Sequence, residues 1–144
     1  MQDAIVREIT VKAPRERVYK AITDPKQIIT WFPDSIEGAL EVGQQVTFDF
    51  GTDGTAIVRV IDAKPHEYFA FRWYTGNDAI TSVLTVPNTL VEFHLEEVGS
   101  GTKVTLKESG FASLPGDRGE KQLNDNTGGW KYMMDRLEKL MNEA

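Results

Sequence analysis

Two ionisable residues lie in segments where apolar and polar side chains alternate, and both have the parity of the apolar residues. Arg7 shares its parity with Ile5 and Ile9. Glu108 shares its parity with Leu106. Because burying an unpaired charge is costly, each of these side chains needs a partner in the folded protein. We predict that Arg7 and Glu108 either form a buried ion pair or anchor a carbonyl or carboxylate group of a ligand.

No other residue pattern predicts a catalytic or metal site. The two histidines, His66 and His94, fall in a turn and on the polar face of a strand, without carboxylates at ligand spacing. Cysteine is absent, which excludes disulfides, thiolate nucleophiles and thiolate metal sites. Neither a Gly-x-Ser-x-Gly elbow nor a glycine-rich phosphate loop after a strand occurs. We therefore predict no catalytic residues, no metal and no cofactor.

The composition fits one domain spanning residues 1–144. The chain has a formal net charge of −6, and binding to nucleic acid needs a basic surface, so a nucleic-acid partner is not expected. No stretch approaches the ~18 consecutive apolar residues of a membrane-spanning helix. The first residues lack the basic and apolar regions of a secretory signal. We expect a cytoplasmic protein that is a monomer or a homodimer.

The period of the apolar residues predicts a run of antiparallel strands followed by one long helix. The clearest hairpin runs from Thr89 to Phe111, and the clearest helix runs from about Glu120 to Asn142. This order predicts an α+β fold in which a curved antiparallel sheet of about six or seven strands wraps the last helix. Further strands are expected at residues 4–12, 46–50, 55–63 and 68–74, a weak strand at 83–84, and two short helices at 14–22 and 24–32.

The facing of segment 55–63 stays open, because both of its parities are apolar. Val58 and Val60 have one parity, and Ile57 and Ile61 have the other. Arg59, which shares the parity of Ile57, is therefore a weaker polar candidate than Arg7 and Glu108.

Large aromatic residues fall mostly on the inward parity of the predicted strands or on the last helix. One interpretation is that these rings simply pack the core. The other is that a curved sheet lined with rings, closed by a helix with flexible methionines, leaves a cavity for an apolar guest. Together with Arg7 and Glu108, the residues predicted to line this cavity are Trp31, Phe32, Phe48, Phe50, Phe71, Trp73, Phe93, Trp130, Met133 and Met134.

The last helix and two loops carry further expectations. We predict that Trp130 stabilises the fold and that Gly128 and Gly129 allow the helix backbone to approach the sheet closely. The loops at residues 75–88 and 112–119 are rich in Gly and Pro. They serve either as ordinary connections or as lids at the mouth of the cavity.

The chain resembles the homologues of the activator of the heat-shock protein 90 ATPase, within the SRPBCC superfamily of START-like and birch-pollen-allergen-type proteins. The segments that carry the resemblance are REITVKAPRERVYKAITDP at 7–25, the Trp31–Phe32 pair, PHEYFAFRW at 65–73, VEFHLEEVGSGTKVTLKESGF at 91–111 and GGWKYMMDRLEKL at 128–140. The resemblance implies a helix-grip fold, in which the first and last strands are neighbours and an apolar cavity lies between the sheet and the last helix.

Three functions remain open on this basis. The first is a binding domain for a hydrophobic or amphipathic small molecule. The second, implied by the family resemblance, is an interaction module for a chaperone; the chain resembles only the carboxy-terminal half of the eukaryotic activators. The third is a cyclase- or hydrolase-like enzyme, for which only Arg7, Arg59 and Glu108 are eligible polar groups. Binding ranks first and catalysis last.

Overall fold

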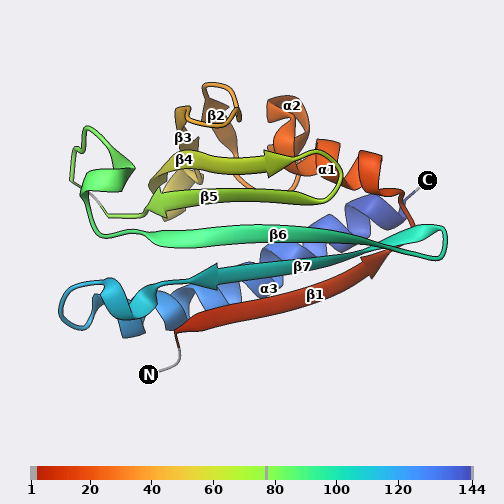
Figure 1. The fold of residues 1–144 in the computed structure, drawn as a ribbon. Coiled ribbons are helices and arrows are strands. Elements are labelled where there is room, and N and C mark those ends of the chain that lie inside the picture. The colour runs from red at the N-terminus through yellow and green to blue at the C-terminus, as the bar shows by residue number, and fades with distance from the viewer. Residues whose placement is uncertain (1–2, 77, 144) are drawn as a thin grey trace.

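The computed structural model describes residues 3–76 and 78–143 and shows an α+β fold with one sheet and one long helix (Figure 1). The loop at 75–88 is described except for its residue 77. In chain order the elements are β1 (Ala4–Val11), α1 (Arg15–Thr23), α2 (Pro25–Ile28), β2 (Ser35–Glu37), β3 (Gln45–Asp49), β4 (Thr55–Lys64), β5 (Tyr68–Tyr74), β6 (Thr89–Val98), β7 (Gly101–Ser109) and α3 (Arg118–Asn142), with single turns of 3-10 helix at Gly51–Asp53, Val83–Thr85 and Phe111–Ser113.

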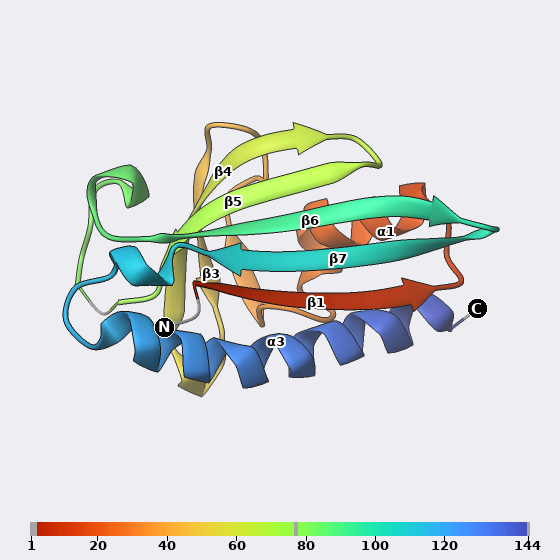
Figure 2. The same ribbon diagram turned by 60° about the horizontal axis from the view of Figure 1, so that its bottom comes forward.

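The described part of the chain forms a seven-stranded sheet in the order β1-β7-β6-β5-β4-β3-β2, in which every neighbouring pair is antiparallel. Helix α3 runs along β1 (Figure 2), while α1 and α2 lie beside one end of the sheet (Figure 1). The predicted curved sheet against a carboxy-terminal helix is therefore confirmed, as is the pairing of the first and last strands.

The β6–β7 hairpin shows how the sequence sets this register. Gly99 turns the chain with a φ of +61°, which favours glycine. Gly101 follows at the start of β7, where a Cβ atom would collide with the main-chain oxygen of Val11. Only glycine lets β7 approach the end of β1 this closely. From there the pairs run in register to Leu90 opposite Ser109.

A register shift in β4 resolves the facing that the sequence left open. Val58 is buried and pairs with Trp73, so the parity of Val58 and Val60 faces the core. Between Val60 and Asp62 the pairing with β5 shifts, and Ile61 remains 37% exposed. The extra residue explains why both parities carry apolar residues, since the shift changes which parity faces the core part-way along the strand.

Three local predictions were wrong in detail. The predicted second helix ends at Ile28 instead of Phe32, and β2, with only three residues, was not predicted. The weak strand predicted at 83–84 is a 3-10 turn. Side chains, and not a neighbouring strand, form hydrogen bonds to the main-chain groups of Val83. Gln45 Oε1 accepts the N–H of Val83, and Asn88 Nδ2 donates to the carbonyl oxygen of Val83.

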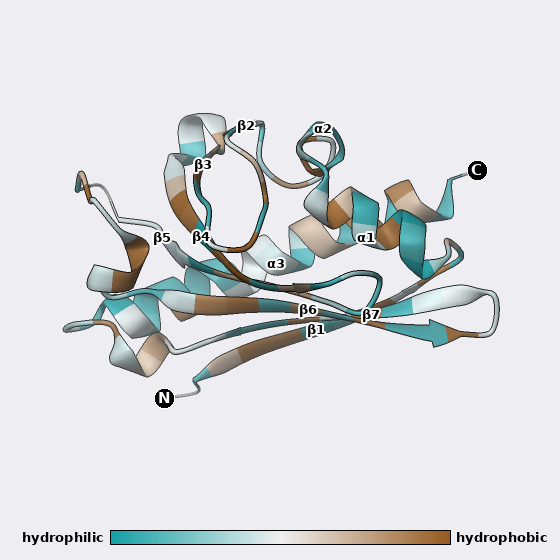
Figure 3. Ribbon diagram, turned by 45° about the horizontal axis from the view of Figure 1, so that its top comes forward, coloured by the Kyte–Doolittle hydropathy of each residue, from teal (hydrophilic) through white to brown (hydrophobic). Residues whose placement is uncertain are grey.

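The core lies between the inner face of the sheet, the short helices and α3. Hydrophobic and hydrophilic stretches alternate along β1 and β6, as expected for strands with one wet face (Figure 3). Trp130 of α3 contacts rings from β5, from β6 and from the turn after α2. Its ring centroid lies 5.1 Å from Phe32, 5.7 Å from Trp73 and 6.1 Å from Phe93. Such contacts fix α3 against the sheet.

Candidate functional site

A completely buried carboxylate, that of Glu108, lies at the centre of the contact between the sheet and α3. Its Oε2 accepts hydrogen bonds from Trp73 Nε1 at 2.8 Å and Thr89 Oγ1 at 2.6 Å. Its Oε1 accepts from Asn126 Nδ2 at 2.9 Å and Trp130 Nε1 at 2.8 Å. A carboxylate is an acceptor at both oxygens, so four donors match its capacity. Glu108 thus links β5, β6, β7 and α3.

The strand register accounts for this cluster. Glu108 pairs with Val91 of β6, and Thr89, two residues earlier, has the same parity. Thr89 in turn pairs with Trp73 of β5, so all three side chains point to the inner face. Asn126 and Trp130 are four residues apart on α3 and therefore reach the same place from one face of the helix.

The predicted ion pair between Arg7 and Glu108 is wrong, although Glu108 does face the interior. Arg7 pairs with Leu106, two positions along from the Ile5–Glu108 pair, and is half-buried. Among the described residues, no ion pair joins Arg7 to Glu108. The carboxylate is instead satisfied by neutral donors, since two indole N–H groups that sequence parity alone could not place converge on it.

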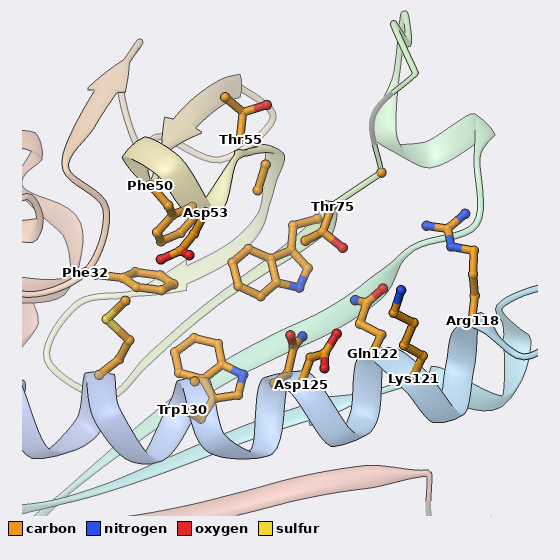
Figure 4. A pocket seen from close by; sticks show the side chains of 16 residues that line it. Phe32, Phe50, Asp53, Thr55, Thr75, Arg118, Lys121, Gln122, Asp125 and Trp130 are labelled. Atoms are coloured by element: carbon orange, nitrogen blue, oxygen red, sulfur yellow. The ribbon is translucent and has the colours of Figure 1, made fainter.

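Directly in front of this cluster lies a pocket of about 680 Å³ between the first turns of α3 and the ends of β3, β4 and β5 (Figure 4). Its volume falls within the roughly 300–1,000 Å³ of typical small-molecule sites. The apolar lining is formed by Phe32, Phe50, Ala56, Trp73, Trp130 and Met133. The polar lining is formed by Asp53, Thr55, Thr75, Arg118, Lys121, Gln122, Asp125 and Asn126.

The predicted cavity residues divide into two groups. Phe32, Phe50, Trp73, Trp130 and Met133 line the pocket. The other aromatic and methionine candidates do not line the pocket and are fully buried behind it; they are Trp31, Phe48, Phe71, Phe93 and Met134. Glu108 is also fully buried and outside the lining. Arg7 lies on β1, also outside the lining.

The polar lining of α3 was missed by the sequence reasoning. Arg118, Lys121, Gln122 and Asp125 follow one another at helical spacing and continue to Gly129. Such an i, i+3, i+4, i+7 stripe leading to Trp130 was a readable signal, but polar stripes usually face solvent. The structure, and not the pattern, shows that this stripe borders a pocket.

The glycine pair before Trp130 has a different role from the predicted one. A Cβ atom at Gly128 or Gly129 would meet no atom within 4 Å, so neither residue marks a close approach to the sheet. Gly129 instead lines the pocket, while Gly128 does not. A side chain at Gly129 would therefore take up space that is now open.

The two loops for which both a connecting role and a lid role were left open contribute residues to the pocket. Thr75 and Gly76 begin the first loop and line the pocket at the end of β5. Arg118, at the junction of the second loop and α3, lines the same side. Its guanidinium lies 5.7 Å from the centre of the Tyr74 ring.

A second cluster lies on the outer face of the sheet, where Tyr68 Oη donates to Glu92 Oε2 at 2.6 Å. Burial, together with this hydrogen bond and the charge of Glu92, raises the pKa of the Tyr68 phenol well above its ordinary value. His94 Nε2 lies 3.9 Å from the same carboxylate and is more than half exposed. Residues 3–76 and 78–143 contain no group of three or more His, Asp or Glu side chains placed to hold a metal ion.

A family model identifies the chain. The model described as "Activator of Hsp90 ATPase homolog 1-like protein" matches residues 12–142. The chain belongs to this family. No curated protein matches this member of the Hsp90 ATPase activator homologue family.

Several solved structures have the same fold. The chain is similar to the Aha1 dimer from Colwellia psychrerythraea, with a TM-score of 0.79, 23% identity, and 98% and 97% of the two chains covered. It is also similar to CalU16 from Micromonospora echinospora, with a TM-score of 0.73, 24% identity, and 96% and 75% covered. DynU16, from the dynemicin biosynthetic locus, gives a TM-score of 0.77 at 25% identity over 96% of this chain.

The chain spans about half of DynU16, 47% of its length. Over the described residues of this family member, no helix is long and apolar enough to cross a membrane.

Proposed function

We propose that this protein binds a hydrophobic or amphipathic small molecule in the pocket between α3 and the sheet. The observation that carries the proposal is a pocket of about 680 Å³ in which four aromatic residues, Phe32, Phe50, Trp73 and Trp130, lie beside a polar lining that comes mainly from α3. Small-molecule sites combine apolar and aromatic side chains, which bury the body of the ligand, with polar groups that fix its orientation.

The Glu108 cluster supports a preformed site. Trp73 and Trp130 both line the pocket, and both are held from behind by the same carboxylate. A wall whose rings are already fixed loses little conformational freedom when a guest binds. The inner-face location is also that of the cavity that the helix-grip fold implies.

Gly129 allows a direct test. Gly129→Leu places a side chain into open pocket space, and Gly128→Leu places the same side chain next to it but outside the pocket lining. Both changes replace glycine by a better helix former, so neither should destabilise the helix. The probe is phenylnaphthylamine, an uncharged aromatic dye that fluoresces in apolar sites.

We expect Gly129→Leu to weaken dye binding by at least about 10-fold, with Gly128→Leu close to the parent protein. Native mass spectrometry of freshly purified protein then identifies any co-purified guest by its mass. Equal binding of the dye by the parent and Gly129→Leu proteins would place the dye elsewhere and refute the proposal.

The family description favours a second candidate, an interaction with an Hsp90-type chaperone. A stimulation assay of chaperone ATPase activity separates the two. Stimulation that is unchanged in Gly129→Leu would favour a surface interaction independent of the pocket.

A further inference from the structure

The pocket differs in chemistry from one end to the other, and this difference bears on its guest. Figure 4 shows Phe32 and Trp130 toward one end and Arg118, Lys121 and Gln122 toward the other. The apolar end includes Met133, one turn beyond Gly129 on α3. The polar end is formed by the first two turns of the same helix together with Thr75.

The aromatic end offers ring faces and no indole hydrogen-bond donor. Both indole N–H groups at this end, those of Trp73 and Trp130, donate to Glu108 behind the wall. The two rings are inclined by only 29°, with their centroids 5.7 Å apart. A guest therefore meets the flat, donor-free sides of these rings, which suits an unsubstituted aromatic body.

The opposite end holds two cations, Arg118 and Lys121, that form no ion pair with any of the described residues. Among the described residues, no carboxylate oxygen lies within 4.0 Å of a side-chain nitrogen of Arg118 or Lys121. Arg118 is half-buried, with its guanidinium over the Tyr74 ring. A cation that is held in place and lacks an anionic partner can take one from a ligand.

Two carboxylates of the lining limit where negative charge on a guest is tolerated. Asp53 lies at the Phe50 side of the pocket, and Asp125 lies between Trp130 and Gln122 (Figure 4). Both side chains are exposed. They repel an anion at the middle or at the aromatic end, and so leave the region of Arg118 and Lys121 as the place for a single terminal charge.

We infer that the guest is an aromatic amphiphile with one terminal anionic group, a carboxylate, sulfonate or phosphate, bound by Arg118 and Lys121 while its ring system lies against Trp130 and Phe32. This inference rests on the proposed function, because it names the ligand class of the same pocket.

Two dyes that differ only in charge provide the test. Anilinonaphthalene sulfonate carries a sulfonate, and phenylnaphthylamine has the same ring system without it. The double variant Arg118→Gln/Lys121→Gln removes both cations but keeps uncharged polar side chains at both positions. Lys139→Gln, an exposed lysine near the other end of α3, is the matched charge control.

We expect the double variant to weaken binding of the sulfonate dye by about 10-fold and to change binding of the neutral dye by less than about 2-fold. Lys139→Gln should leave both affinities unchanged. Gly129→Leu should weaken both dyes together. If the double variant changes the two dyes equally, or neither, while Gly129→Leu still weakens both, the anionic end is refuted and the pocket proposal stands. If Gly129→Leu leaves both affinities unchanged, or the native protein binds neither dye, the pocket proposal fails as well.

Discussion

Two carboxylates of one hairpin, Glu108 in β7 and Glu92 in β6, face opposite sides of the sheet and are stabilised in different ways. Glu108 is fully buried and accepts four hydrogen bonds from neutral donors. Glu92 is 20% exposed and accepts one, from Tyr68. Water can complete the shell of Glu92, whereas the protein has to supply every donor for Glu108. The comparison shows that a carboxylate can be buried without a cationic partner when several neutral hydrogen-bond donors replace the water around it.

The same comparison explains why the inner cluster, and not the outer one, is next to the pocket. Three of the four donors to Glu108 come from residues that line the pocket: Trp73, Asn126 and Trp130. The carboxylate therefore fixes the wall without being part of the lining. On the outer face, Tyr68 and His94 lie in an open polar depression, and the hydrogen bond from Tyr68 to Glu92 joins β5 to β6, which the sheet already pairs.

Truncating the tryptophan of the inner cluster should have the largest effect. Trp130→Ala removes a buried ring and one donor to Glu108, and should lower the free energy of unfolding by roughly 3–5 kcal/mol. Tyr132→Ala, on the exposed side of the same helix, should cost about 0.5 kcal/mol or less. Urea unfolding of both variants measures the difference, and a Trp130→Ala protein as stable as the parent would contradict the expectation.

Replacing each carboxylate by an amide tests the comparison itself. In Glu108→Gln the new NH₂ group faces donors in place of an acceptor, so we expect a loss of about 2–3 kcal/mol. Glu92→Gln can still accept the Tyr68 hydroxyl and should cost about 1 kcal/mol or less. Denaturant midpoints at neutral pH, with tryptophan emission as the probe, give both values. Similar losses for the two variants would show that the number of donors does not matter.

The outer cluster should respond to alkaline pH. The pKa of Tyr68 is raised in the folded protein. The stability that the protonated Tyr68 contributes to the fold is therefore fully present below about pH 10, the ordinary phenol pKa, and is lost as the pH rises above that value. Tyr68→Phe removes the hydrogen bond at a cost of about 1 kcal/mol at pH 7 and should make the alkaline loss of stability shallower. Unfolding midpoints between about pH 8 and 11 measure both effects, and parallel curves for the two proteins would refute the coupling.

Arg7→Ala should have the smallest effect. Since Arg7 has no ion pair with Glu108, its loss should cost about 1 kcal/mol or less, mainly from lost packing of its stem. The Arg7→Ala and Glu108→Gln losses should then add in the double variant. A coupling energy between the two substitutions well above about 0.5 kcal/mol would indicate that Arg7 and Glu108 interact after all.

The sequence by itself determined the elements that depend on local patterns. The alternation in β6 and β7, the turn at Gly99 and the 3.6-residue period of α3 are local properties, and they predicted the hairpin, the helix and the inward facing of Glu108. Where a local pattern was ambiguous, as in the apolar parities of β4, or where side chains replaced main-chain pairing, as at Val83–Thr85, the prediction remained open or was wrong.

Only the tertiary structure determined which side chains contact one another across the core. Parity gave Glu108 and Arg7 the same face, but partners depend on distances between residues remote in sequence. The donors Trp73 and Trp130 lie 2.8 Å from the Glu108 oxygens although they are 35 and 22 residues away along the chain. The pocket also depends on tertiary structure. Whether aromatic rings fill a space or line it depends on the combined volume of side chains from several elements, which cannot be read from any one segment.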